Sequence, residues 1–116
     1  MNEQQIGAVK KLTKATKDGK IKWLNKTING MHVYTCTHDI NYSIQVKYVR
    51  RDSISVLIEC NTENPFTVLE VGASHGGPIV NHWHVLEPLA NAIVEYLKDC
   101  ARQDASEAIA EFVETL

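Results

Sequence analysis

Residues 71–88, "VGASHGGPIVNHWHVLEP", combine three of the chain's five histidines with three glycines, a serine and a tryptophan. Residues of these types could supply three kinds of chemistry. Imidazoles could bind a metal, glycines with positive φ could turn backbone amides toward an anion, and the indole could stack on a ring. No motif in the chain names a reaction, so each kind of site has to be weighed from residue types and spacing.

An anion-binding loop is the first interpretation of this segment. Gly72, Gly76 and Gly77 can adopt positive φ, and the helical periodicity that follows places a positive helix end nearby. Two arginines at a predicted hairpin tip could clamp a phosphate or carboxylate. A plain connection between sheet and helix is the alternative. The predicted ligand-binding residues are Ser74, His75, Gly76, Gly77, His82, Trp83, His84, Arg50 and Arg51.

A zinc site is the second interpretation. His82 and His84 would point to the same side of an extended segment, and His75 or Glu87 could complete a three-ligand site with an open position for water. That geometry fails if residues 82–84 are helical, because residues two apart lie about 200° around a helix axis. The alternative function is therefore a zinc-dependent hydrolase; without zinc, we predict no cofactor.

Covalent catalysis is disfavoured by the positions of the nucleophiles. Cys36, Cys60 and Cys100 lie in apolar patterns where a thiolate is unfavourable, and their number and spacing fit neither a disulfide framework nor a zinc ribbon. Ser74 beside His75 lacks an orienting acid and an oxyanion hole. We therefore expect a binding protein that is not an enzyme.

Charge is distributed unevenly along the chain, although the net charge is only −2. Residues 1–30 hold seven lysines and two acids, and residues 87–116 hold seven acids and two basic residues. We expect the basic segment to lie near the acidic one, in the same chain or in a neighbouring subunit. Nucleic acid is disfavoured as a partner because nucleic-acid modules are usually net basic with interleaved aromatics. The absence of long apolar runs predicts no membrane span and a cytoplasmic protein.

Hydrophobic periodicity predicts the first two thirds of the fold. Residues 3–18 repeat apolar side chains every three to four positions, which predicts a helix that stops at Gly19. Residues 31–72 alternate with a period of two and are broken by turn residues, which predicts four strands, and residues 20–24 could begin a fifth. Short turns join antiparallel neighbours, so the sheet should be a meander.

The last third returns to helical spacing. One helix should begin near residues 82–87 with Pro88 in its first turn, and the capping-box spacing of Asp104 and Glu107 predicts a second helix. Its apolar stripe runs to Leu116 and must be covered by the sheet or by a second subunit. The prediction for residues 1–116 is a single α+β domain with an N-terminal helix, an antiparallel meander of four to five strands, and two C-terminal helices packed on one sheet face.

The segments "LTKATKDGKIKW" and "DASEAIAEFVETL", together with this layout, resemble small uncharacterised single-domain proteins of bacteria and their phages. The resemblance implies a stand-alone protein of the cytoplasm, or of the host cytoplasm if a phage encodes it. The resemblance implies no agreed activity, and by analogy alone it suggests a protein that sequesters a host signalling molecule or blocks a host protein. The resemblance assigns no role to the histidine-rich segment.

These observations lead to one leading hypothesis of function and to two alternatives. The leading hypothesis is a non-enzymatic, homo-oligomeric protein that binds a small anionic, nucleotide-like ligand with the loop at 72–84. One alternative is the zinc-dependent hydrolase that uses His75, His82 and His84. The other alternative is a protein-interaction module that acts through the C-terminal helix.

Overall fold

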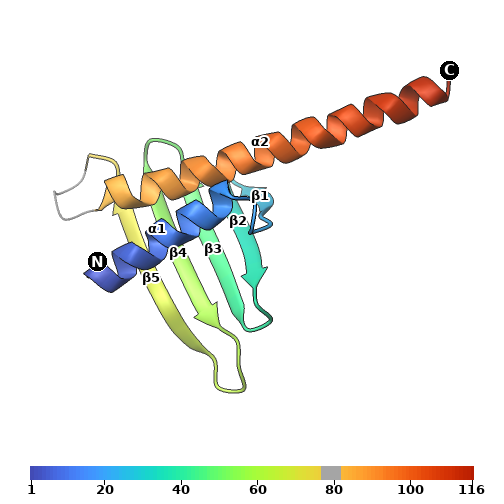
Figure 1. Cartoon of the computed structure of the whole chain (residues 1–116). Coiled ribbons are helices and arrows are strands. Elements are labelled where there is room, and N and C mark those ends of the chain that lie inside the picture. The colour runs from blue at the N-terminus through green and yellow to red at the C-terminus, as the bar shows by residue number, and fades with distance from the viewer. Residues whose placement is uncertain (77–81) are drawn as a thin grey trace.

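Five strands that follow one another in chain order form an antiparallel sheet, and two helices lie on one face of it (Figure 1). The structure is a computed structural model that describes residues 1–76 and 82–116. The predicted α+β meander with an N-terminal helix is confirmed. The elements are α1 (Glu3–Lys17), β1 (Leu24–Ile28), β2 (Met31–His38), β3 (Tyr42–Val49), β4 (Ser53–Cys60), β5 (Phe66–Ser74) and α2 (Trp83–Glu114).

Helix α1 has well-defined signals at both ends. The Asn2 side chain accepts a hydrogen bond from the Gln5 amide at 2.8 Å, and the Gln5 side chain accepts one from the Asn2 amide at 3.0 Å. This reciprocal pair is a capping box and satisfies two amides that the first turn leaves unpaired. Gly19 follows the helix with φ of 72°, the left-handed conformation that glycine adopts most easily.

Two-residue periodicity sorts the side chains of the sheet onto two faces. Ile44 pairs with Ile58 and Val46 with Val56 on the face beneath the helices, whereas Lys47 pairs with Ser55 on the other face. The chain reverses between β1 and β2 at Asn29 and Gly30, which both have positive φ, as a two-residue hairpin turn requires. The face that carries Lys47 and Ser55 is therefore the one that faces away from both helices.

The prediction of two C-terminal helices is wrong, because α2 is a single helix of 32 residues. Asp104 and Glu107 lie inside α2 and cap nothing. The residues around Asp104 and Glu107 include alanine, arginine, glutamine and glutamate, which favour helix, and no glycine or proline interrupts the helix there. The change in the apolar pattern at this point marks a change of face on one helix and not a break in the chain.

Pro88 was expected in the first turn of this helix, but it is the sixth residue of α2. It lacks the amide that would donate to the carbonyl of residue 84, so the second turn loses one hydrogen bond. The side chain of Pro88 is exposed, so its ring faces solvent and takes no part in the core. The most deeply buried residues of α2, Leu86, Leu89, Ala90 and Ile93, lie on both sides of Pro88 in the sequence.

The C-terminal end of α2 extends beyond the rest of the protein (Figure 1). Every residue from 101 to 116 is exposed. We name residues 101–116 the tail. No helix among the described residues is long and apolar enough to cross a membrane.

A buried hydrogen-bond chain joins α1 to the segment before β1. The Trp23 indole N–H donates to Thr16 Oγ1 at 3.1 Å, and the Thr16 hydroxyl donates to the Leu12 carbonyl at 2.9 Å. Trp23 and Thr16 are 3% and 1% exposed, so no water can replace the threonine oxygen as the acceptor. A buried N–H without an acceptor costs far more free energy than a typical hydrogen bond contributes.

Replacement of Thr16 by valine keeps the shape of the side chain but removes the acceptor for the indole. We expect Thr16→Val to lower the free energy of unfolding by about 1–3 kcal/mol, measured by urea denaturation. Thr13→Val is the matched control, because the Thr13 hydroxyl donates only to the Val9 carbonyl, at 2.9 Å, and its loss should cost under about 1 kcal/mol. Equal losses in the two variants would contradict this account.

Candidate functional site

The two ends of the histidine-rich loop lie at the end of the sheet that also carries the β3–β4 hairpin. The His75 amide donates to the Asp52 carbonyl at 2.8 Å, which holds the start of the loop against the hairpin tip. The rings of His75 and Trp83 meet edge to face with centroids 5.4 Å apart. The structure therefore brings His75 close to Trp83 and places the hairpin that carries Arg50 and Arg51 beside the loop.

The glycines of this segment differ in role. Gly76 has φ of 74°, as a turning glycine would, and lies beside the exposed His75. Gly72 was expected in the loop, but it is inside β5, paired with Ser55. Ser74 is the last residue of the same strand, paired with Ser53. Gly77 lies outside the described residues.

His82 and His84 do not lie on an extended segment. His82 has φ of 55° and is the N-cap of α2, and His84 is already in the first turn. Their rings are 6.1 Å apart, and the indole N–H of Trp83 donates to the Glu87 carboxylate at 2.9 Å. Within residues 1–76 and 82–116, no three histidine, cysteine, aspartate or glutamate side chains are grouped as a metal site requires. The zinc alternative stays a prediction, without a site among these residues.

A cleft of about 550 Å³ lies between α2 and the strands β1–β3. We name it the β-side cleft. It forms at the part of the sheet where α2 leaves the body of the protein, so the helix covers these strands only in part. Of the two arginines predicted to bind a ligand, Arg50 lines this cleft and Arg51 does not. The residues that line it are Asn25, His32, Tyr34, Tyr48, Arg50, Asn91, Val94, Glu95, Leu97, Lys98 and Ala101.

Aromatic side chains form the floor of the β-side cleft. The rings of His32 and Tyr34 are nearly parallel, 5° apart in plane, with centroids 5.9 Å apart. Tyr34 and Tyr48 are 2% and 7% exposed. Burial raises the pKa of the Tyr34 phenol above its usual value, and the nearby Tyr48 raises it further, so the Tyr34 hydroxyl is a donor at neutral pH. The period-two pattern predicted strands at these positions and no site.

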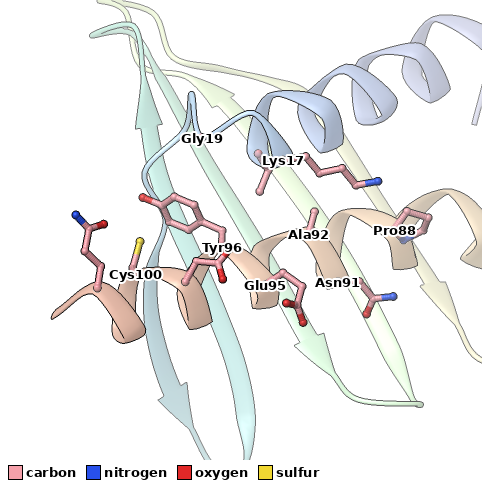
Figure 2. A pocket seen from close by; sticks show the side chains of 11 residues that line it. Lys17, Gly19, Pro88, Asn91, Ala92, Glu95, Tyr96 and Cys100 are labelled. Carbon is pink, nitrogen blue, oxygen red and sulfur yellow. The ribbon is translucent and has the colours of Figure 1, made fainter. Parts of the chain in front are cut away.

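A second groove, of about 680 Å³, runs along the opposite side of α2, where the end of α1 approaches it (Figure 2). We name it the α-side groove. Lys17 of α1 lines it together with Glu95 and Asp99 of α2, so carboxylates outnumber the cation. Pro88, Tyr96 and Cys100 supply much of its remaining surface. The two sides of α2 therefore differ in charge.

The tail carries the densest group of exposed apolar side chains among the described residues. Ile109, Phe112, Val113 and Leu116 are 64%, 62%, 58% and 89% exposed. The other large exposed apolar side chains lie on the two edge strands or at hairpin ends. The sequence indicated that this stripe needs a cover, and the structure shows that the chain's own sheet does not provide one.

The lysine-rich helix α1 packs against α2, as the charge distribution predicted, but no ion pair joins the two helices among the described residues. Among the described residues, the two ion pairs are Lys98–Glu95 and Arg102–Asp99, and both lie within α2. Their side chains are more than half exposed, so each contributes little to stability.

Comparisons with protein-family models, with curated proteins and with solved structures give no match. The proposals below rest on the geometry and chemistry of the described residues.

The three cysteines differ sharply in access. Burial raises the pKa of the Cys36 thiol to about 11, so very little of it is thiolate near neutral pH. Cys60 is buried as well, whereas Cys100 is partly exposed.

We expect a thiol reagent such as DTNB at pH 8 to modify one cysteine, Cys100, quickly in the folded protein and all three in denaturant. Cys100→Ser should remove the fast phase, and its persistence would contradict this assignment.

Proposed function

We propose that this protein is a non-enzymatic interaction module that assembles through the tail of α2, and that the tail's partner is a second copy of the chain. The observation that carries the proposal is the apolar stripe formed by Ala105, Ile109, Phe112 and Leu116, which none of the described residues of the same chain covers. A stripe of this kind on an exposed helix marks a surface that binds another protein. We name these four residues the tail stripe.

The direction of the tail stripe supports a separate chain as its cover. At about 100° per residue, the stripe lies about 140° around the helix axis from the face that Leu86, Leu89 and Ile93 bury against the sheet. A longer sheet in the same plane would therefore leave the stripe uncovered. A partner must approach α2 from the side.

Charge on the tail favours an apolar partner face over a basic one. Asp104, Glu107, Glu111 and Glu114 all lie on the side of the helix roughly opposite the tail stripe. The positions that flank the stripe are Ser106, Ala108, Val113 and Thr115, none of which is charged. A basic target helix would find no acids beside the stripe, whereas two copies of the tail can meet without repulsion between their acids.

The spacing of the tail stripe fits an antiparallel pair. The four residues are separated by four, three and four positions, an order that reads the same in both directions. In an antiparallel pair, Leu116 of each copy therefore lies opposite Ala105, and Ile109 lies opposite Phe112. Large side chains opposite small ones at the ends allow close packing, and a two-fold interface repeats each favourable contact.

The strength of this pair can be bounded from the side chains that it buries. Full burial of Ile, Phe or Leu stabilises by about 1.5–3 kcal/mol, so the six side chains of the two copies give roughly 9–18 kcal/mol. Loss of translational and rotational freedom costs roughly 4–15 kcal/mol. The net free energy is modest, so we expect a reversible dimer with Kd on the order of 10 μM.

Sedimentation of Phe112→Asp tests the proposal. The wild-type protein should dimerise at tens of micromolar, and Phe112→Asp should weaken dimerisation by about 100-fold or more, because a carboxylate would be buried in the interface. Ala110→Asp is the matched control, since it adds the same charge on the opposite side of the tail and should leave dimerisation nearly unchanged. A wild-type protein that stays monomeric at 200 μM would overturn the proposal, as would equal effects of the two variants. If the chain is monomeric and its tail binds a different protein, that protein is the partner of the tail and the proposed dimer is wrong.

Disulfide trapping tests the antiparallel direction. In a Cys100→Ser background, Ala105→Cys alone should not cross-link, because the two residues at 105 lie about 16 Å apart along the axis of an antiparallel pair. A mixture of Ala105→Cys and Leu116→Cys should cross-link as a heterodimer. Cross-linking of Ala105→Cys with itself is the result expected of a parallel pair, and it would exclude the register proposed here.

A further inference from the structure

We propose that the β-side cleft is a binding site for a small anion that carries an aromatic or heteroaromatic ring. The site goes beyond the proposed assembly function, because every residue that lines it belongs to one protomer. The ring would lie on the aromatic floor, and the anionic group would lie between Arg50 and Lys98 at the mouth.

The floor of the β-side cleft suits a flat ring. His32 and Tyr34 lie one after the other on the same face of β2, with nearly parallel rings, and Tyr48 lies opposite His32 in the sheet. Val94 and Leu97 of α2 form the apolar wall across from them. A planar ring between these layers would contact aromatic side chains on one side and aliphatic carbons on the other.

The mouth of the cleft suits an anion. Arg50 comes from the β3–β4 hairpin and Lys98 from α2, so two cations approach from separate elements. Arg50 has no carboxylate within 4 Å among the described residues, and Lys98 is held only by an exposed pair with Glu95 at 3.5 Å. A carboxylate or phosphate can therefore bind both cations while displacing only this exposed ion pair, and the guanidinium can donate two parallel hydrogen bonds to it.

Charge distinguishes this cleft from the α-side groove on the other side of α2. Two cations and one carboxylate line the β-side cleft, whereas one cation and two carboxylates line the α-side groove. The α-side groove is somewhat larger, yet its charge would repel an anion. The volume of about 550 Å³ falls in the range of small-molecule pockets and accepts a single ring system with its anionic group.

Two ligand sources share this chemistry, and the experiment separates them. One arm uses aryl carboxylates, namely 4-hydroxybenzoate and indole-3-acetate, and the other uses AMP, GMP and UMP. Binding is followed by calorimetry and by amide chemical shifts of residues 32, 34, 48 and 50. We expect at least one probe to bind with Kd below about 1 mM, and its neutral analogue, the amide or the nucleoside, to bind at least 10-fold more weakly. The arm that binds identifies the source.

Arg50→Gln and its neighbour Arg51→Gln form a matched pair of variants. Arg50→Gln should weaken binding of the best probe at least 10-fold, Lys98→Gln should weaken it several-fold, and Arg51→Gln should leave it unchanged, because Arg51 does not line the cleft. Both arginines are exposed, so these substitutions should leave folding intact. Phe112→Asp should bind the probe as tightly as the wild-type protein does. A protein that does not dimerise can therefore still show whether the β-side cleft binds a ligand.

Three results would overturn the site. They are no binding by any of the five probes at 10 mM, equal binding by Arg50→Gln and Arg51→Gln, and chemical-shift changes confined to residues outside the β-side cleft. Changes confined to residues around His75 and Trp83 would be one such result, and they would indicate that the ligand binds at the histidine-rich loop.

Discussion

The length of α2 is the constraint on which the rest of this protein depends. Its 32 residues span about 48 Å, whereas five strands at their usual spacing make a sheet only about 20 Å wide, and strands of eight or nine residues extend about 30 Å. Even a diagonal path across such a sheet leaves a substantial part of the helix without support. The exposed tail and the longest dimension of the molecule, 57 Å, follow from this mismatch.

The mismatch also creates the β-side cleft. A helix that crosses the sheet diagonally covers β4 and β5 near its start and leaves the β1–β3 side only partly covered. At such a boundary, tyrosine and histidine are suitable residues, because an apolar ring can fill the core while its polar atom reaches water or a ligand. Val46 and Val56, which are fully buried, occupy the same sheet face where coverage is complete. The polar character of the cleft is therefore a consequence of where α2 leaves the sheet.

The sequence predicted the sheet well because each strand repeats one local pattern that solvent and core enforce. It predicted α2 poorly, since the change of apolar phase near residue 104 has two physical meanings: a break between helices, or a single helix that presents a different face. Helix-favouring residues without glycine or proline keep α2 continuous here, and no sheet lies beneath residues 101–116 onto which a second helix could pack. Arg50 and Arg51 were equivalent in sequence, and only the turn geometry places one of them in the cleft. His32, Tyr34 and Lys98 were missed because their roles depend on three elements that are distant in the chain.

Successive parts of α2 thus serve three different surroundings. Leu86 to Ile93 pack on the sheet, residues 91–101 form one wall of the β-side cleft, and the tail stripe begins at Ala105. The tail stripe continues on the same side of the helix as the cleft, and Lys98 and Arg102 lie in line with it, between the cleft and Ala105. These two cations resist burial in an apolar interface, so they limit the proposed pair of tails to residues 105–116 and keep the mouth of the cleft in water. One charged turn of helix therefore separates a surface suited to a second copy from a pocket suited to an anion.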